Sequence, residues 1–289
     1  MKILSAILIT LISFGAFAAE FSLRGGFMTP DKMEATTYGA RLSEKLEISE
    51  THSLTIEAKY DAIDFNSAAS FMPDRLERAE IGANIMGSEY FIDTKLGVAG
   101  DEAFGTSESL YVQFVGTKKV YESGNHGFHL GIAASNKKFL DEYNVLPALA
   151  YSYGTENFNL MIGSINLIKW QPNERYSLEA AISVLGDGQV KGTYHWSKDF
   201  KTSLVYRNIY ETYYLSDDYP DDTYLKLRTA SVMLEAEKNL YGYATLMLSA
   251  GIVTSAKYYT YDKDDSDDRI NSQSVNTGAI GSAELRIKF

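Results

Sequence analysis

Apolar and polar residues alternate along most of the chain after residue 19. Within the segment 53–64, the residues at even positions from 54 to 62 are apolar and the residues between them are polar. The apolar set is Leu54, Ile56, Ala58, Tyr60 and Ala62, and the polar set is Thr55, Glu57, Lys59 and Asp61. A period of two is typical of a β-strand with two different faces, whereas a helix repeats about every 3.6 residues. Helical periodicity is nearly absent, so the pattern predicts an all-β protein.

Similar runs recur at 90–98, 110–116, 128–134, 176–184 and 190–196. Many short strands of this kind form either a soluble β-sandwich or β-propeller, or a membrane barrel whose apolar face turns toward lipid. Charges of both signs on the polar face favour the barrel, because they suit a hydrated lumen. The candidate lumen-lining residues are Arg41, Lys45, Glu57, Lys59, Asp61, Arg78, Glu80, Asp93, Lys95, Glu179, Lys191 and Arg207. A soluble sandwich with these side chains outside remains the alternative.

The predicted connections alternate between short and long, as in outer-membrane barrels with short periplasmic turns and longer outer loops. The short connections are 49–52, 86–89, 154–157, 171–174, 197–200 and 238–241, and the long ones are 28–36, 65–74, 100–108, 135–144, 216–222 and 258–274. Four of the five prolines fall in these connections, and Pro147 lies at the start of a strand. Prolines at such positions leave the hydrogen-bond ladders intact.

A first count of the strands gives fifteen, but a bacterial single-chain barrel needs an even number. The segment 157–170 is the best candidate for a wrongly assigned strand. Its alternation stops at Gly163 and Ser164 and resumes out of phase at Ile168 and Trp170. Two short strands joined by a tight turn would restore an even number. We therefore predict a single transmembrane antiparallel up-and-down β-barrel with sixteen strands favoured; fourteen or twelve stay possible, and each leaves a lumen.

The N-terminus has the features of a cleaved secretory signal peptide. Met1 and Lys2 precede an apolar run to Phe14, and Ala16 and Ala18 occupy the positions that signal peptidase requires. The run is too short for a membrane-spanning helix. We expect residues 1–18 to be the signal peptide and residues 19–289 to be the outer-membrane barrel. No later apolar stretch is long enough for a transmembrane helix, so any crossing must be made by strands.

Composition excludes several classes of function. The chain has no cysteine, which excludes a lipid-modified cysteine, disulfide bonds and thiolate metal sites. Its formal net charge of −11 argues against nucleic-acid binding, which depends on Lys and Arg side chains at phosphates. We therefore expect an exported protein of the Gram-negative bacterial envelope that binds no nucleic acid.

The C-terminal residues form a strand with one apolar row, made of Gly281, Ala283, Leu285, Ile287 and Phe289. This row resembles the C-terminal assembly signal of bacterial outer-membrane barrels, whose last strand ends on an aromatic residue. The resemblance implies that Leu285, Ile287 and Phe289 are read by the barrel-assembly machinery. A closing edge strand of a soluble protein is the alternative, but an uncapped apolar edge there would invite pairing with other chains.

Two further segments carry a family resemblance. They are Leu146-Pro147-Ala148-Leu149-Ala150-Tyr151 and Trp170-Gln171-Pro172-Asn173-Glu174-Arg175. With them, about a hundred residues of the chain are similar to a widespread family of uncharacterised outer-membrane barrels, in which a strand ends with Trp-x-Pro-Asn-Glu. The resemblance implies a barrel and does not imply an activity.

Tyrosines crowd the long connections near residues 206–224 and 258–261. We interpret Tyr206, Tyr210, Tyr213, Tyr214, Tyr219, Tyr224, Tyr258, Tyr259 and Tyr261 as part of an outer aromatic girdle, since such rings concentrate at membrane interfaces. A sugar-stacking site is the alternative interpretation.

Candidate chemistry is sparse. The four histidines are His52, His126, His129 and His195, and we interpret all four as ordinary solvated residues. Clustered carboxylates occur at 217–222 and 262–268, and such oxygen ligands suit divalent ions. The second cluster, with Asp262, Asp264, Asp265, Asp267 and Asp268, is not an EF-hand because Asp267 replaces the required glycine. We expect a solvated loop there, with a divalent-ion site as the alternative, and no cofactor.

The sequence therefore favours a passive porin-type channel for small solutes in the cell outer membrane, and not an enzyme. The alternatives are a structural or adhesive surface barrel with a plugged lumen and, less favoured, an outer-membrane lipid hydrolase. Expected partners are outer-membrane lipid and lipopolysaccharide. The acidic loops predict a weak preference for cations.

Overall fold

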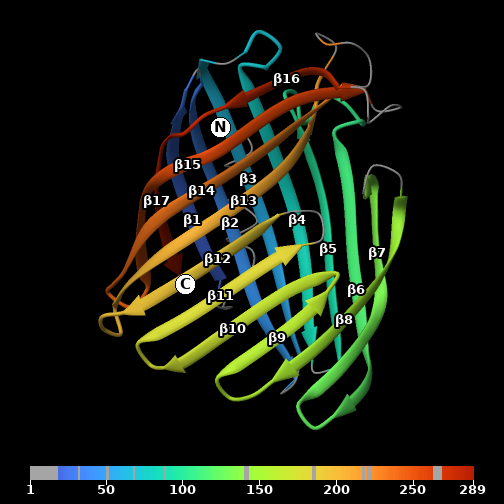
Figure 1. Ribbon diagram of the computed structural model, residues 1–289, viewed down its shortest axis with the longest axis vertical. Coiled ribbons are helices and arrows are strands. Elements are labelled where there is room, and N and C mark those ends of the chain that lie inside the picture. Colours follow the sequence, from blue (N-terminus) through green and yellow to red (C-terminus); the bar gives the residue numbers. More distant parts are fainter. Residues whose placement is uncertain are drawn as a thin grey trace.

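The computed structural model describes residues 19–31, 33–49, 52–67, 69–87, 89–139, 143–183, 187–216, 219, 223–262 and 269–289, and it is all-β (Figure 1). Its strands are β1 (Ala19–Pro30), β2 (Glu34–Ser49), β3 (His52–Ser67), β4 (Arg75–Gly87), β5 (Tyr90–Gly100), β6 (Leu110–Ser123), β7 (His126–Phe139), β8 (Tyr143–Gly154), β9 (Phe158–Gly163), β10 (Ile165–Asn173), β11 (Tyr176–Ser183), β12 (Gly188–His195), β13 (Phe200–Tyr214), β14 (Thr223–Leu240), β15 (Ala244–Asp262), β16 (Arg269–Val275) and β17 (Gly278–Lys288). None of the described residues belongs to a helix long and apolar enough to cross a membrane.

Each strand from β1 to β15 pairs antiparallel with the next strand in the sequence, and β1 pairs with β17, so the sheet closes into a barrel. The described part of the chain has seventeen strands but sixteen positions around the ring. Both β16 and β17 pair with β15, and they do so in one register: Val253 pairs with Gly278, and Ala256 pairs with Val275. The two strands are therefore one long strand, interrupted for two residues. The predicted sixteen-strand antiparallel barrel is confirmed.

The tight turn predicted inside the segment 157–170 is also present. β9 ends at Gly163 and β10 begins at Ile165, so that Ser164 alone connects them. Gly163 has a φ of 155°, and a Cβ atom there would lie 1.9 Å from the carbonyl oxygen of Leu149. Only glycine fits this position. One further short turn, between β6 and β7, was not predicted; it uses Gly124 with a φ of 58°.

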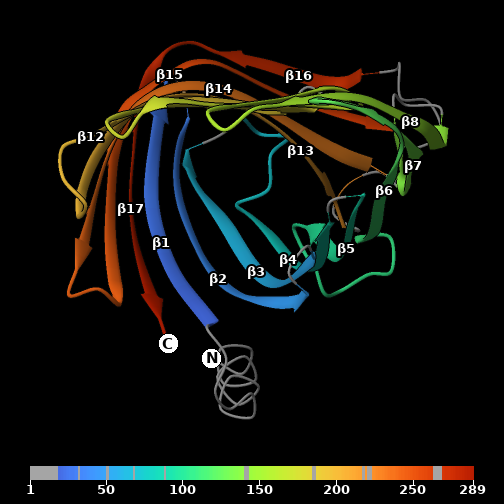
Figure 2. The same ribbon diagram turned by 90° about the horizontal axis from the view of Figure 1, so that it is seen from below.

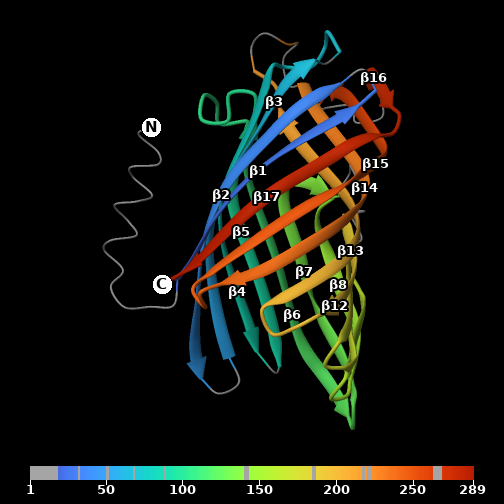
Figure 3. The same ribbon diagram turned by 90° about the vertical axis from the view of Figure 1, so that its left-hand side faces the viewer.

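The short turns that join β2 to β3, β4 to β5, β6 to β7, β8 to β9, β10 to β11, β12 to β13 and β14 to β15 lie, with the terminal residue Phe289, at one end of the barrel, which we call the turn end. The long connections lie at the other end, which we call the loop end. Figure 3 shows β1, β2 and β17 side by side in one wall, with β16 at the loop end. The backbone N–H of Phe289 donates to the carbonyl oxygen of Ala19, so the first and last strands are joined down to the turn end.

The outer face of the barrel is apolar. Large side chains such as Leu23, Ile81, Leu130, Leu204 and Leu248 are among those on this face, and each is about half exposed or more. Their neighbours in the sequence point to the inner face. An apolar outer surface on a closed sheet is what a lipid environment requires, since closure satisfies the backbone hydrogen bonds within the protein.

Aromatic rings on the outer face gather at the turn end, where the sequence analysis did not place them. Tyr153 contacts Phe158, and Tyr194 contacts both Tyr176 and Trp196, with ring centroids 4.5–6.2 Å apart. Rings in such a band are typical of a membrane interface. We call these residues, with Trp170, the aromatic belt.

The predicted outer girdle is partly wrong. Tyr213 and Tyr258 are only 2 % and 1 % exposed, and both point into the barrel. They belong to an apolar cluster that fills the interior at the loop end. It includes Met28, Met33, Ala35, Phe65, Met72, Leu76, Ala99, Tyr111, Tyr213, Leu215, Leu225, Leu227, Val253, Ala256, Tyr258 and Val275. Tyr214, Tyr224 and Tyr261 are also buried, in a separate small cluster. Tertiary packing, which a local pattern does not reveal, decides these positions.

One section of the barrel wall is low because its strands are short, and we call it the low wall. β9, β10, β11 and β12 have 6, 9, 8 and 8 residues, whereas β8 and β13 on either side have 12 and 15. Figure 1 shows the four short strands ending well below the loop ends of β7 and β8. The ladder between β12 and β13 ends at Gly188 and Asn208, and that between β8 and β9 ends at Ala150 and Gly163.

We predict that Gly163→Ala destabilises the barrel by about 3 kcal/mol, because the new Cβ atom would strike the Leu149 carbonyl and the backbone would be strained. The matched control is Gly192→Ala in β12, where nothing lies within 4 Å of the Cβ position. Urea unfolding in detergent micelles, followed by tryptophan fluorescence, measures both variants. Equal stability of the two would contradict the steric argument.

Candidate functional site

The candidate site is the interior of the barrel, where charged side chains pair with one another. The pairs are Arg41 with Glu57 at 2.5 Å, Lys59 with Asp61 at 2.7 Å, Lys95 with Glu80 at 3.8 Å, Lys191 with Glu235 at 2.7 Å and Arg207 with Glu235 at 3.7 Å. Asp61 also accepts from Arg24. These pairs contain most of the residues predicted to line the lumen. Opposite charges therefore compensate one another along the inner face, as a buried or half-buried charge requires.

Lys45, Asp93 and Glu179, which were also predicted to line the lumen, do not belong to these pairs. Lys45 pairs with Glu47 at 2.6 Å, and both side chains are mostly exposed near the turn end. Asp93 accepts a long hydrogen bond of 3.4 Å from Asn84. Glu179 lies opposite Lys169 and Lys191 in the ladders of β10 and β12. Whether the whole set lines a conducting lumen stays a prediction.

An ion pair joins opposite walls of the barrel. Arg78 of β4 donates to Glu211 of β13 at 2.8 Å, although 133 residues separate them in the sequence. The Tyr213 ring lies under the Arg78 guanidinium, with 5.0 Å from its carbon to the ring centroid. The sequence analysis singled out Arg78 but missed Glu211, whose partner lies far away in the chain.

The backbone also crosses the barrel. Tyr214 of β13 forms a parallel bridge with Gly100 of β5, and Figure 2 shows β13 running across the inside toward β5. A Cβ atom at position 100 would lie 2.7 Å from the Tyr214 carbonyl oxygen, so this approach requires glycine. Asp101 completes the link: its carboxylate accepts from the backbone N–H of Ser216 at 2.8 Å and from the Ser216 hydroxyl at 3.0 Å. We call these interactions the cross-barrel contact.

The cross-barrel contact divides the loop end into two parts. Between β1–β5 and β13–β17, the apolar cluster fills the space. Below it lies a small cavity of about 180 Å³, bordered by the charged groups of Arg24, Asp61, Arg207 and Glu211 and by apolar side chains of the cluster. This part of the barrel is therefore closed toward the loop end by side chains from opposite walls.

The part between β6 and β12 is lined differently. The exposed, outward residues Ile132, Leu149 and Ile162 show which neighbours point inward. Near the loop end most of those inward residues are small or apolar, and Gln113 and Ser135 are polar exceptions. The small or apolar ones are Val115, Ala133, Leu146, Ala148, Ala150, Met161 and Leu167. Nearer the turn end they are polar: Lys119, His129, Ser152, Asn159, Lys169 and Glu179. The polarity of the inner face thus changes along the barrel axis.

Two serine and histidine pairs occur on the inner face near the turn end. His129 Nε2 lies 2.9 Å from Ser152 Oγ, and His195 Nε2 lies 3.5 Å from Ser177 Oγ. Within the described ranges, neither histidine makes a hydrogen bond to a carboxylate, which a serine hydrolase uses to orient its base. His126 and His52 bond to Tyr151 and Ser49 at turns. That the chain is not an enzyme stays a prediction.

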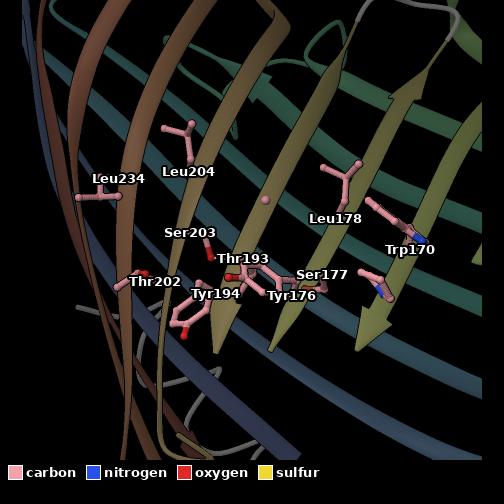
Figure 4. Close-up of a pocket in the computed structure, with 12 residues that line it drawn as sticks. Trp170, Tyr176, Ser177, Leu178, Thr193, Tyr194, Thr202, Ser203, Leu204 and Leu234 are labelled. Atoms are coloured by element: carbon pink, nitrogen blue, oxygen red, sulfur yellow. Dashed lines mark hydrogen bonds between the residues drawn. The ribbon is translucent and has the colours of Figure 1, made fainter. Parts of the chain in front are cut away.

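A hollow of about 440 Å³ lies on the outer face above the turn end (Figure 4). Leu178, Leu204 and Leu234 border it on the side toward the loop end, and Trp170 and Tyr194 border it below. It exists because Gly192, between Leu178 and Leu204 in the ladder, has no side chain. Its apolar lining suits the acyl chain of a membrane lipid, which any lipid-facing surface would contact.

Asp187 directly precedes β12, on the side of the loop end. Its carboxylate accepts the backbone N–H of Tyr210 at 2.5 Å. The acidic residues Asp264, Asp265, Asp267 and Asp268 lie outside the described residues, and Asp262 is the last residue of β15.

The sequence matches no family model and no curated protein. The fold is similar to that of several solved outer-membrane proteins. An outer membrane channel from Pseudomonas putida F1 covers 96 % of this chain and 97 % of its own, with a TM-score of 0.42 and 9 % identity. OmpT, an outer membrane protein of Vibrio cholerae, covers 94 % and 96 %, with a TM-score of 0.36 and 9 % identity. The NanC porin covers 93 % and 100 %, with a TM-score of 0.34 and 9 % identity.

Likeness at this level concerns the architecture alone. The chain itself has a closed antiparallel sheet, an apolar outer face and a belt of aromatic rings. The chain has the architecture of an outer-membrane porin-like barrel.

We predict that the double variant Asp101→Cys/Ser216→Cys forms a disulfide on mild oxidation, because the two side chains meet in the cross-barrel contact. The chain has no cysteine of its own, so a mobility shift on a non-reducing gel reports this pair alone. Asp101→Cys/Ser197→Cys is the control, since Ser197 lies in a turn at the opposite end. Cross-linking no greater than in the control would refute the contact.

Proposed function

We propose that the protein is a passive channel for small solutes in the outer membrane, and that the solute path lies in the part of the barrel bounded by β6–β12. The cross-barrel contact is the observation that supports this path. It joins β5 to β13 at Gly100 and Tyr214, while the apolar cluster occupies the space on its other side.

The interior chemistry supports passive movement of small molecules. Toward the turn end, Lys119, Asn159, Lys169 and Glu179 offer both signs of charge and neutral polar groups to a hydrated path. Toward the loop end, the lining is small and weakly polar, so a solute meets few strong binding groups. A path of this kind lets molecules enter and leave without tight binding.

The surroundings of the channel follow from the same proposal. Outer-membrane lipid and lipopolysaccharide would contact the apolar face, and export would use the signal peptide of residues 1–18. The C-terminal strand with Leu285, Ile287 and Phe289 would be read by the assembly machinery. Phe289 is 71 % exposed on the outside at the turn end, where such a reader could reach it.

A structural barrel with a plugged lumen is the second candidate, and the apolar cluster favours it. Side chains of Phe65, Met72, Tyr213 and Leu225 meet in the interior and are nearly completely buried. Burying such side chains stabilises a fold by about 1.5–3 kcal/mol each, so the cluster also serves stability. The two candidates differ in whether the part between β6 and β12 conducts.

We predict that Ala133→Trp strongly lowers the single-channel conductance in planar lipid bilayers, because its side chain would project into the path from β7. The adjacent control is Ala134→Trp, which projects to the outer face and should leave the conductance unchanged. Both variants add the same bulk one residue apart, so a common folding defect would affect them alike.

The conductance of the oxidised Asp101→Cys/Ser216→Cys variant is an independent measurement. It should conduct as the unmodified protein does, because the cross-barrel contact borders the path and does not occupy it. If the correctly folded protein fails to conduct, the plugged structural barrel replaces the channel. If Ala134→Trp reduces conductance as much as Ala133→Trp, the proposed path is wrong.

A further inference from the structure

The low wall is lowest at the hairpin of β9 and β10, and the aromatic belt gives a reference level there. The ring of Phe158 contacts that of Tyr153, and Phe158 pairs with Trp170 in the ladder. From Phe158 the strand continues five residues to Gly163. With a rise of about 3.3 Å per residue and a tilt of about 40°, the hairpin stands roughly 13 Å above the belt.

The lipid-facing surface beside the hairpin is higher. On β8, outward residues from Tyr153 through Leu149 and Pro147 to Val145 are aromatic or apolar, and Leu149 and Val145 are 57 % and 59 % exposed. The eight residue steps from Tyr153 to Val145 correspond to roughly 20 Å, against about 25 Å for the apolar band of such barrels. The hairpin therefore ends about 7 Å below the apolar boundary on β8.

Chain length fixes this height. Ser164 is the single residue between β9 and β10, so no further segment can extend that hairpin. The connection between β11 and β12 has four residues, 184–187, which cannot build a longer pair of strands. The low wall is thus a property of the covalent chain and does not depend on how its loops are arranged.

The edge of β8 above the hairpin has features that protect an open strand. The Ser164 hydroxyl accepts the backbone N–H of Leu149 at 3.1 Å, and the Ser164 N–H donates to the Leu149 carbonyl at 2.9 Å. The backbone N–H and C=O groups of Leu149 therefore point away from β7. The backbone of the residue two positions earlier is oriented in the same way. That residue is Pro147, which has no N–H to leave unpaired.

The edge of β13 on the other side of the low wall is capped at both ends. After the ladder with β12 stops at Asn208, the N–H of Tyr210 donates to Asp187, and the carbonyl of Tyr214 accepts from the N–H of Asp101 at 3.2 Å. An open sheet edge at membrane depth is otherwise costly. We call the space between the edges of β8 and β13, above the short strands, the gap. Because both edges are protected, we infer that the gap is an intrinsic part of the fold.

On the side of β7, β8 and β9, the interior next to the gap is apolar. Leu146 and Ala148 on β8, Ala133 on β7 and Met161 on β9 point inward at this level. On β10 and β11 the charged inward residues Lys169 and Glu179 lie lower, near the belt. A molecule that passes the hairpin tip would thus move from the lipid chains to a lining of similar polarity.

From these observations we propose that the barrel wall has a lateral opening, which we call the side entrance. The hairpin of β9 and β10 forms its lower edge, or sill. Small apolar or amphipathic molecules exchange through it between the barrel interior and the outer leaflet. The inference goes beyond the proposed channel, because it assigns a second mouth and a substrate class. It requires that the barrel lies in a membrane, but it does not require that ions pass along its axis.

The first test measures the depth of the sill. A nitroxide label is attached to Ser164→Cys in a barrel folded into phosphatidylcholine vesicles, and its accessibility to oxygen is compared with that to a water-soluble nickel chelate. Leu130→Cys, on the outer face of β7, is the lipid control, and Ser107→Cys, in the exposed connection between β5 and β6, is the water control.

We expect the label at Ser164 to favour oxygen, as the label at Leu130 does. A label at Ser164 that matches Ser107 would place the hairpin tip in water and overturn the proposal. Ile162→Cys, one position lower on the same outward surface, is measured as well, so that a local disturbance at Ser164 cannot decide the outcome.

The second test asks whether lipid chains reach the interior. Single tryptophans are introduced as Leu146→Trp, Val145→Trp and Val115→Trp in a background with Trp170→Phe and Trp196→Phe, and quenching by chain-brominated phosphatidylcholine is measured. Val145 points outward, whereas Leu146 points inward at the open edge and Val115 points inward on β6.

We expect the intensity lost by Leu146→Trp to approach that lost by Val145→Trp, with little loss for Val115→Trp. Quenching of Leu146→Trp as weak as that of Val115→Trp would refute the entrance. Neither test depends on conductance. Failure of the axial channel and failure of the side entrance are therefore distinguishable.

Discussion

Backbone hydrogen bonding in a lipid environment is the constraint on which this structure depends. Every N–H and C=O group at membrane depth needs a partner within the protein, so the strands must close into a ring. The chain meets this demand where its first and last strands meet, since β1 pairs with β17 over its whole length. The same demand for backbone partners explains why β16 and β17 keep one register on β15 across the two-residue break between them. The apolar outer face and the paired interior charges follow from the same closed sheet.

The interior combines two solutions to the burial of charge. Along each wall, neighbouring strands supply opposite charges, as Arg41 and Glu57 do, so each pair is compensated locally. Arg78 and Glu211 differ because they come from opposite walls, and their pairing holds β13 against β4 and β5. Removing either partner would leave a charge in a confined space, which costs more than an exposed pair would contribute. The cross-barrel contact therefore depends on both side chains together with the missing side chain of Gly100.

Much of the ring could be predicted from the sequence, because strand faces and turns are local properties. Alternation gave the strands, and the broken phase at Gly163 and Ser164 gave the extra turn that makes the number even. Most predicted charged residues lie in the interior pairs for the same reason. The cross-barrel contact could not be predicted, since Asp101 and Ser216 are 115 residues apart and no local pattern connects them. Tyr213 and Tyr258 were assigned to the outside because an aromatic ring suits both an interface and a core, and only packing distinguishes the two.

The closed part and the low wall are consequences of one strand. β13 pairs with β12 as far as Asn208, and beyond that residue it turns inward and reaches Gly100 of β5. The edge of β13 that faces Gly100 is the edge that a longer β12 would occupy, so it cannot serve both partners. Had β12 continued upward, β13 would stay in the wall, the space over the apolar cluster would widen, and the gap would close. The short strands β9–β12 and the cross-barrel contact therefore require each other. Any movement that releases Tyr214 from β5 should alter the interior and the side of the barrel at the same time.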